Sequence, residues 1–377
     1  MKVIRAMRPY TICLILAAAH FLSAAIAAPA DTKPVKRPIV CCYYFDGWAD
    51  ESPGNFHLRQ PADIDLMDHF PDREPTTGWF DDSLPIVQQQ TAMAASAGIT
   101  AFIFDWYDTT RTTNESDKTL NSALGLFRSL PDKHGMKYCL LYVNNGSYNI
   151  PQDAWAAQCQ AWVQGPFKDP DYLKIDGKPA LVVYSIKDII KEWGADNIAQ
   201  PCNILRAAAA AAGFPGVYII ASCRPPSAPA SQDPGQPTYY GFDAFTGYNY
   251  PRVNGTNVTG ENPYSVLVNG SIGFWNGFAN TDRVPYIPVV TAGWDPRPWK
   301  KGAFWYDRTP SEFADFVTQA MQWSLAHPIT PNLSGTPVIV VEAWNELGEG
   351  SYIMPTRGDG DAYARALRNA VDGHSTP

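Results

Sequence analysis

Short apolar runs rich in β-branched and aromatic residues recur along the chain, and each run ends in polar or aromatic residues. There are eight such runs, over residues 38–45, 99–107, 137–144, 179–185, 217–224, 242–250, 285–293 and 337–344. Nearly continuous apolar runs of this length are typical of strands that are buried on both faces, as in a parallel sheet. The pattern therefore predicts eight parallel strands.

Helical patterns separate most of these predicted strands. They cover residues 82–99, 116–135, 151–165, 203–213 and 309–327, and a closing helix is expected over 360–373. Asp82 or Ser83 is a suitable N-cap for the first helix, and Gly98 is a suitable stop. The connections into the sixth and seventh strands, 224–238 and 251–270, are instead rich in loop-forming residues.

Repeated alternation of strands and helices predicts an α/β fold, the (β/α)8 or TIM barrel, in a single domain. The chain is longer than a bare barrel requires, so we expect long βα loops, one of them over residues 46–85. A doubly wound open sheet is the alternative. The first predicted strand, however, is not followed by the Gly-rich turn of a dinucleotide site, and no Walker-type loop occurs.

Residues 1–28 have the pattern of a secretory signal peptide. Lys2, Arg5 and Arg8 precede a long apolar run that ends in small residues. The run is close to the length of a membrane-spanning helix, but His20 and Ser23 interrupt it, which favours cleavage over anchoring. We therefore expect a secreted or periplasmic protein that leaves the membrane after cleavage, with one catalytic domain over residues 35–377.

Charge and composition narrow the class of partner. The formal net charge is −8 and no basic cluster occurs, which argues against nucleic acid and anionic membranes as partners. Aromatic residues make up 13% of the chain, a share that suits the stacking of sugars as well as a packed core. Six scattered histidines show no metal-ligand spacing, and no Gly-x-Ser-x-Gly elbow of a serine hydrolase is present. We expect a monomer that needs no metal or other cofactor.

Cysteines leave two possibilities open. Six follow the signal segment, and in an exported chain they would allow up to three disulfides. Several lie inside apolar runs, where a buried free thiol is equally compatible with the pattern. The six are Cys41, Cys42, Cys139, Cys159, Cys202 and Cys223.

Candidate chemistry lies at the ends of the predicted strands, where (β/α)8 barrels form their active sites. Carboxylates and amides bind sugar hydroxyls and rings stack on sugar faces, so this mixture predicts a carbohydrate cleft. The candidates for substrate binding are Tyr44, Asp46, Asp105, Trp106, Tyr107, Asn144, Tyr250, Trp294, Asp295, Arg297, Trp344, Asn345 and Tyr352. Close to them in the sequence are Trp48, Asn145, Tyr248, Asn249 and Trp299.

Some of these candidates also have a purely structural explanation. Asp105 would serve as a helix cap, and Asn144 would suit a turn. Asp295 and Arg297 would pair with each other, and Trp294 would fill space in a loop. The sequence does not decide between these roles and substrate binding.

The segment "EAWNELGEGSY" at the end of the eighth predicted strand carries the strongest catalytic signal. If the chain turns helically there, Glu346 and Glu349 are neighbours at positions i and i+3. Carboxyl groups about 5 Å apart are expected of retaining glycosidases. Two close carboxylates also raise the pKa of one of them, which leaves one acid and one base. Glu342 lies within the strand and is expected to have a supporting role, whereas an acidic surface corner is the alternative for the whole segment.

Several motifs resemble glycoside hydrolase family 99 and the related WbsX-like proteins. "AWNELGEGSYIMPT" is similar to the Asn-Glu-Trp-x-Glu-Gly signature of the last barrel strand, and "FKDPDYLKIDGKPALVVYS" and "GWDPRPW" resemble further parts of that group. "YYFDGW" and "ITAFIFDWY" fit its first two strands. The resemblance implies a (β/α)8 enzyme, an endo-acting α-mannosidase or α-mannanase that needs no metal for its chemistry.

The resemblance also implies a retaining mechanism with divided roles. Glu346 would take the proton of the sugar 2-hydroxyl, which forms a 1,2-anhydro sugar, and Glu349 would be the general acid and then the base for water. The family's aromatic residue between the two is Leu347 here, and the third strand ends in "YVNNGSY" without the family's acidic residue. These departures leave the sugar open among α-linked glycans.

The leading hypothesis is a secreted glycoside hydrolase that cleaves α-linked oligo- or polysaccharides through Glu346 and Glu349. One alternative is a non-catalytic glycan-binding barrel. Another is an α-1,3-glucanase, because family 71 carries a similar Trp-Asn-Asp-x-x-Glu element. The last is a WbsX-like glycosyltransferase, which the signal segment disfavours because sugar nucleotides are cytoplasmic donors.

Overall fold

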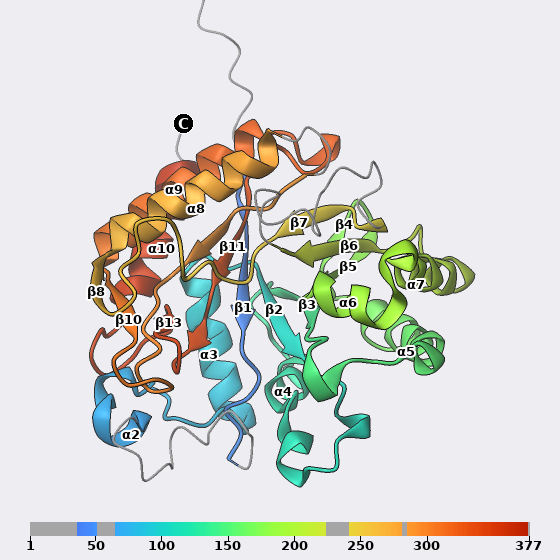
Figure 1. Cartoon of the computed structure of the whole chain (residues 1–377), viewed down its shortest axis with the longest axis horizontal. Coiled ribbons are helices and arrows are strands. Elements are labelled where there is room, and N and C mark those ends of the chain that lie inside the picture. The colour runs from blue at the N-terminus through green and yellow to red at the C-terminus, as the bar shows by residue number, and fades with distance from the viewer. Residues whose placement is uncertain (1–35, 51–64, 224–240, 281–284, 376–377) are drawn as a thin grey trace, which may run out of the picture. The chain divides into compact units, whose positions relative to one another are not determined.

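Eight parallel strands form a barrel in the part of the chain that the computed structural model describes, residues 36–50, 65–223, 241–280 and 285–375. Their order is β7-β6-β5-β3-β2-β1-β11-β9 (Figure 1). The two ends of this order meet through residues 285–287. The amide of Phe245 donates to the carbonyl of Pro285 and that of Ile287 donates to the carbonyl of Phe245, both at 2.8 Å. The barrel strands are β1 (Ile39–Tyr44), β2 (Ala101–Trp106), β3 (Lys137–Tyr142), β5 (Lys178–Val183), β6 (Tyr218–Ser222), β7 (Ala244–Thr246), β9 (Val289–Thr291) and β11 (Val338–Glu342).

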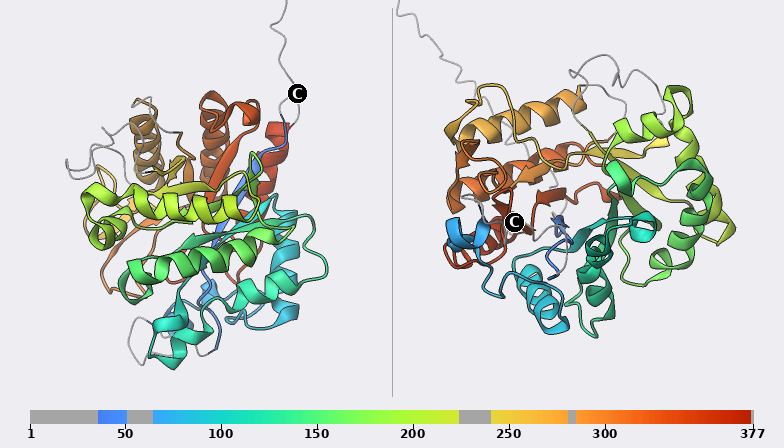
Figure 2. Two further views of the ribbon diagram at one scale, coloured as in Figure 1. Left: turned by 90° about the vertical axis from the view of Figure 1, so that its right-hand side faces the viewer. Right: turned by 60° about the horizontal axis from the view of Figure 1, so that its bottom comes forward.

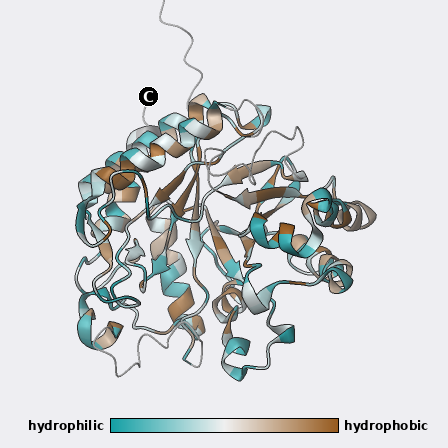
Figure 3. Ribbon diagram, viewed as in Figure 1, coloured by the Kyte–Doolittle hydropathy of each residue, from teal (hydrophilic) through white to brown (hydrophobic). Residues whose placement is uncertain are grey.

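The barrel confirms the fold predicted from the apolar runs. Each of these strands overlaps one predicted run, and β11 is buried along its whole length. Val340 of β11 lies opposite Cys41 on one side and Val289 on the other. Apolar residues therefore dominate the barrel strands, as Figure 3 shows. Burial of such residues is the main term that stabilises the fold.

Helices lie around the outside of these strands (Figures 1 and 2). α3 begins after the extended N-cap residue Ser83 and ends just before Gly98, as predicted. α9 begins with Pro310 and a capping box, in which Thr309 and Glu312 bond each other's backbone amides. The larger helices are α3 (Leu84–Ser96), α4 (Ser122–Ser129), α5 (Gln152–Gln164), α6 (Ile186–Trp193), α7 (Ala199–Ala211), α8 (Tyr264–Ala279), α9 (Pro310–Ala326) and α10 (Ala362–Ser375).

Helix α8 corrects the prediction of a loop over residues 251–270. Three glycines and two asparagines lower its helix propensity, and this concealed a regular spacing of buried residues. Most of its buried residues recur every three or four positions, and Trp275 stacks on Phe316 of α9 at 5.3 Å. Gly270 has a packing reason, because a Cβ there would lie 2.3 Å from the Cβ of Val253. The short helix α6 was also not predicted.

Short elements complete the loops. β4 pairs antiparallel with β5, β8 pairs with β10, and β12 forms a hairpin with β13. The loop after β1 contains α2 and η2 and is the long βα loop predicted over residues 46–85. These elements are α2 (Leu66–His69), β4 (Lys174–Ile175), β8 (Gly260–Pro263), β10 (Phe304–Asp307), β12 (Asn345–Glu346), β13 (Ser351–Tyr352), η2 (Pro71–Arg73), η3 (Thr109–Arg111), η4 (Glu115–Thr119), η5 (Gly146–Tyr148), η6 (Pro166–Lys168), η7 (Ala195–Asn197) and η10 (Pro331–Leu333).

The six cysteines are free thiols, and five of them are buried. Burial raises the pKa of Cys41 to about 12, which keeps this thiol protonated and unreactive. No helix within the described ranges is long and apolar enough to cross a membrane. The predicted signal peptide and the predicted loop over 224–238 lie outside the described residues.

Candidate active site

A pocket of about 550 Å³ opens at the C-terminal ends of the strands, where barrels form active sites. Carboxylates lie among aromatic rings in its wall. Three acids reach it from two separate parts of the barrel, β2 and the hairpin after β11. The lining residues are Phe45, Trp48, Asp105, Tyr107, Leu120, Val143, Asn145, Tyr148, Tyr184, Tyr248, Trp299, Glu346, Gly348 and Glu349.

The turn after β11 brings Glu346 and Glu349 into this pocket together. β12 and β13 pair antiparallel on either side of the turn, so the glutamates lie on a closed hairpin. Gly350 has a φ of +66°, and a Cβ there would lie 2.7 Å from the Cβ of Asp295. Glycine is therefore required at this position both by the backbone conformation and by the close approach of the neighbouring loop.

Hydrogen bonds connect the acidic side chains of the site. The hydroxyl of Tyr248 lies 2.5 Å from Oε1 of Glu346 and 3.0 Å from Oδ2 of Asp105. Asn249 donates from Nδ2 to Oε2 of Glu349 at 2.8 Å. Tyr248 and Asn249, in the segment that follows β7, thus hold both glutamates from a strand end that only β9 separates from β11.

Glu342 is completely buried beneath the pocket at the end of β11. The hydroxyl of Ser351 donates to its Oε2 at 2.8 Å, while its Oε1 has no protein partner within the described residues. The peptide bond that follows Glu342 is cis. Glu342 does not line the pocket, a position in keeping with the supporting role expected of it.

Burial dominates the electrostatics of the cluster. It raises the pKa of Glu346 to about 7, although the hydrogen bond from Tyr248 opposes the shift. Burial and the charges of Glu346 and Glu342 raise the pKa of Glu349 well above its usual value. Burial and the charge of Glu346 do the same to the pKa of Asp105. A group that ionises near neutral pH beside one that keeps its proton can act as a base and an acid.

Four predicted site residues line the pocket: Asp105, Tyr107, Glu346 and Glu349. Asn345 does not line the pocket but is buried and joins two segments of the site. Its side-chain amide accepts from the backbone N–H of Phe45 at 2.8 Å and donates to the carbonyl of Phe45 at 3.0 Å. The amide thus fixes the hairpin that carries Glu346 to the end of β1.

Three other predicted residues, at the ends of β1 and β2, make contacts within the protein and do not reach the pocket. Tyr44 is buried and bonds Asp81 and Gln90 through its hydroxyl. The carboxylate of Asp46 accepts from the backbone amides at the start of α4, at 2.9 and 2.8 Å. Trp106 packs on the ring of Trp162. These contacts are structural, and none of the three side chains lines the pocket.

Three further predicted residues also make contacts within the protein. The amide of Asn144 exchanges hydrogen bonds with the backbone of Ser185, both at 2.8 Å, which links the ends of β3 and β5. Tyr250 is buried, and its hydroxyl bonds the carbonyl of Cys223. The buried indole of Trp344 donates to Gln90. None of these three side chains lines the pocket.

The predicted residues after β9, together with Tyr352 of β13, belong to a cluster beside the turn that carries Glu346 and Glu349. Asp295 pairs with Arg297, as the structural explanation had it, and also with Arg73. Trp294 packs on Phe304, and the ring of Tyr352 lies under Arg308. The cluster supports the site from outside the pocket.

Several lining residues escaped the predicted set. Tyr248, Asn145, Trp48 and Trp299 were noticed in the sequence but were not chosen as site residues. Tyr184 closes the run "PALVVY", and its position at a strand end is the signal that would have identified it. Phe45 closes the first apolar run in the same way. Gly348 lies between the two glutamates, and the other lining residues carry no comparable signal: Leu120, Val143 and Tyr148. Across the described residues, no group of three or more His, Cys, Asp or Glu side chains has an arrangement that could hold a metal ion.

A (β/α)8 barrel with buried carboxylates and rings at the C-terminal face fits the class of glycan-processing enzymes, and the family match places the chain in that class. Within that class, the chain belongs to the family described as "Glycosyltransferase WbsX", which matches residues 62–367. This confirms the resemblance found in the sequence motifs. A comparison with curated proteins finds no match.

Solved structures share the barrel. The endo-α-mannosidase of glycoside hydrolase family 99 from Bacteroides thetaiotaomicron, in complex with Bis-Tris-propane, is 17% identical with a TM-score of 0.59, over 89% of this chain and 97% of that one. A structure described as a glycoside hydrolase-like protein is 16% identical with a TM-score of 0.62, over 92% and 97% of the two chains. At these identities the likeness is one of fold.

Proposed function

We propose that the protein is a secreted glycoside hydrolase that cleaves an uncharged, α-linked oligo- or polysaccharide with retention of configuration. The observation that carries the proposal is the position of Glu346 and Glu349. They are 6% and 9% exposed, lie on one turn, and face a pocket walled by aromatic rings. Their raised pKa values are those of a pair that divides the acid and base roles.

The hydrogen bonds support a particular division of these roles. Glu346 accepts from Tyr248, which favours its ionised form and suits a base. Glu349 keeps its proton more firmly, which suits a general acid. Glu346 takes the proton of the 2-hydroxyl as O2 attacks C1, while Glu349 protonates the departing glycosidic oxygen. Water then attacks C1, giving its proton to Glu349, and O2 recovers a proton from Glu346.

The charge of the pocket supports hydrolysis over transfer from a nucleotide sugar. Among the described residues that line it there is no Lys, Arg or His, while three carboxylates are present. Phosphates are usually held by cations or by helix N-termini. A pocket lined by acids, rings and uncharged residues suits neutral sugars and disfavours diphosphates, uronates and sulfated glycans.

The same cluster argues against a barrel that only binds glycans. Burying carboxylates is costly, because each loses its hydration. Asp105, Glu342, Glu346 and Glu349 are all buried, although stacking rings and exposed amides would suffice to hold a sugar. A catalytic role explains why four buried acids lie in one cluster.

The experiment is digestion of a panel of α-mannans, α-1,3-glucans and other α-glucans. We expect oligosaccharide products, as from an endo-acting enzyme, and the product anomer first released should match the substrate linkage by NMR. Glu346→Gln and Glu349→Gln should each lower turnover at least a hundredfold, whereas the exposed control Glu115→Gln should not. Full turnover in both site variants would remove the assignment. Binding without any product would favour the glycan-binding alternative.

A further inference from the structure

The hydroxyl of Tyr248 connects two carboxyl groups that come from different parts of the barrel. Glu346 lies on the hairpin after β11 and Asp105 at the end of β2, and the tyrosine hydroxyl is 2.5 Å from the first and 3.0 Å from the second. Both distances are within the range of O–H···O hydrogen bonds. The arrangement therefore contains two hydrogen bonds around one phenol oxygen.

Two such bonds need two protons. A phenol has a single O–H and donates one hydrogen bond, and an ionised carboxylate only accepts. One contact is thus supplied by the proton of Tyr248 and the other by a proton on a carboxyl group. The contact with Glu346 is the shorter and has the length of a bond from a hydroxyl to an ionised carboxylate. The second proton therefore belongs to Asp105.

We propose that Asp105 is a neutral carboxylic acid that donates its proton to the oxygen of Tyr248, while Tyr248 donates to the ionised Glu346. Asp105 and Tyr248 are then positioning residues that keep the base of the reaction ionised and correctly oriented. This role rests on the proposed function, because Glu346 is the base only in a glycosidase of this kind. The order of donors itself does not depend on the substrate.

The surroundings of Asp105 favour its neutral form. It is 3% exposed, and its Oδ1 has no hydrogen-bond partner among the described protein atoms. A neutral carboxyl tolerates this burial far better than a charged one.

No cation faces this cluster from the described elements that pack against it. The ionisable neighbours are all acids or phenols, so each negative charge added to the cluster favours a proton on Asp105. They come from β1 and its end, from the ends of β2, β5 and β7, and from β11 and its hairpin. The groups are Tyr43, Asp46, Tyr107, Tyr184, Tyr248, Glu342, Glu346 and Glu349.

Ring packing holds the connecting tyrosine in place. The ring of Tyr248 lies 4.8 Å from that of Tyr43 and 5.5 Å from that of Tyr184, measured between centroids. Its hydroxyl therefore has little freedom to leave the two carboxyl groups. The order of proton donors is thus set by the barrel before substrate binds.

Infrared difference spectroscopy on the full chain tests the proposal without any substrate. At neutral pH the wild-type protein should show a protonated carboxyl band that Asp105→Asn removes. Labelling aspartate with ¹³C should move that band, which separates it from the bands of the glutamates. If Asp105→Asn does not fold, Tyr248→Phe provides the second reading, because loss of the acceptor should shift the same band to higher frequency. An unchanged protonated-aspartate signal in these variants would overturn the proposal.

Kinetics on an active substrate give an independent reading. Hydrogen bonds to charged groups contribute about 1.5–3 kcal/mol, so Tyr248→Phe should move the acidic limb of the pH–rate profile upward by about one to two units. Asp105→Ala should also move it upward. In Asp105→Asn the amide still donates to Tyr248, so the limb should stay in place. If both Asn and Ala move the limb downward, a negative charge has been removed from beside Glu346, so Asp105 is ionised in the working enzyme and the proposal is wrong.

The two kinds of measurement separate this inference from the proposed function. If no glycan is cleaved and the infrared band of Asp105 is found, the hydrolase assignment fails and the order of donors stands. If glycans are cleaved and the band is missing, the hydrolase assignment stands and the order of donors fails.

Discussion

Arg73 donates from its guanidinium to the carbonyl of Leu347 at 2.8 Å, and this bond ties the long loop after β1 to the turn between Glu346 and Glu349. Arg73 is buried, and it also forms an ion pair with Asp295. The backbone amide of Asp295 in turn donates to the carbonyl of Glu349 at 2.5 Å. The ion pair between Arg73 and Asp295 thus stabilises the turn that carries Glu346 and Glu349.

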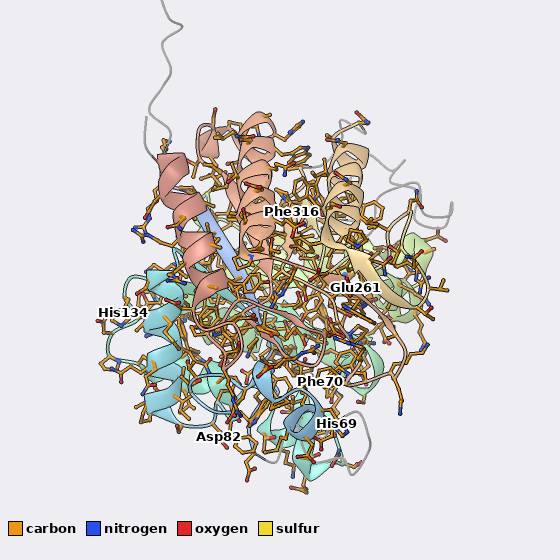
Figure 4. All side chains as sticks on the ribbon, turned by 90° about the vertical axis from the view of Figure 1, so that its left-hand side faces the viewer. His69, Phe70, Asp82, His134, Glu261 and Phe316 are labelled. Atoms are coloured by element: carbon orange, nitrogen blue, oxygen red, sulfur yellow. The ribbon has the colours of Figure 1, made fainter. Side chains whose placement is uncertain are left out.

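Removing Arg73 should damage both stability and activity. Arg73→Leu removes the hydrogen bonds of a charged group but leaves Asp295 paired with Arg297, so the cost should be about 1.5–3 kcal/mol. We expect a loss of this order in the free energy of unfolding, measured by urea denaturation, together with a lower kcat because the turn shifts. Arg297 also lies 5.6 Å from the ring of Phe70. Phe70, labelled in Figure 4, belongs to the loop after β1 that also contains Arg73.

Arg365→Leu is the matched control for that variant. Arg365 is 69% exposed and pairs with Asp361 one helical turn away, an interaction of about 0.5 kcal/mol or less. It should leave stability and kcat nearly unchanged. Equal effects of the two substitutions would show that the Arg73 pair does not position the turn.

The raised pKa of Glu346 predicts that the protein is most stable in mild acid. A carboxyl with a folded pKa of about 7 and an ordinary value of 4.5 binds its proton more tightly in the folded state. Stability from this group is therefore complete below about pH 4.5 and is lost as the pH rises through about 7. The difference corresponds to about 3 kcal/mol. Thermal unfolding should show a falling Tm between these pH values, and Glu346→Gln should flatten the slope.

Activity should follow a bell-shaped pH profile. The base must be ionised, so the acidic limb should lie near the pKa of Glu346, about 7. The acid must keep its proton, and the pKa of Glu349, raised by burial and by two neighbouring glutamates, sets an alkaline limb at higher pH. Initial rates between pH 5 and 10 test this. A rate that already declines from pH 5 upward would contradict these roles.

Much of the fold could be predicted because the barrel strands are nearly uninterrupted apolar runs. The eight parallel strands and the helices with clear caps, such as α3 and α9, followed from period and capping alone. α8 could not be predicted, because its helix is stabilised by packing that the local propensity opposes. Gly270 illustrates this, since it lowers helix propensity yet permits the contact with Val253.

Prediction of the site depended on which strand-end side chains point into the pocket. Glu346, Glu349, Asp105 and Tyr107 were found because acids and rings at a C-terminal strand end are informative. Asp46 has the same residue type and a similar position, yet it caps α4. The direction of a side chain depends on contacts between distant segments, and a single sequence does not record them.

The last prediction tests whether Trp299 at the rim of the pocket binds the polysaccharide by ring stacking. It is 42% exposed at the rim of the pocket, with its indole against the backbone of Gly348 in the catalytic turn. Ring stacking contributes about 1 kcal/mol, so Trp299→Ala should lower kcat/KM on a polysaccharide about fivefold, mostly through KM. Trp299→Phe should recover part of the loss, and Val258→Ala, 68% exposed outside the pocket lining, serves as the control. Short oligosaccharides that do not reach the rim should be affected less than the polymer. An equal loss on both, accompanied by a lower Tm, would instead indicate that Trp299 only supports the turn.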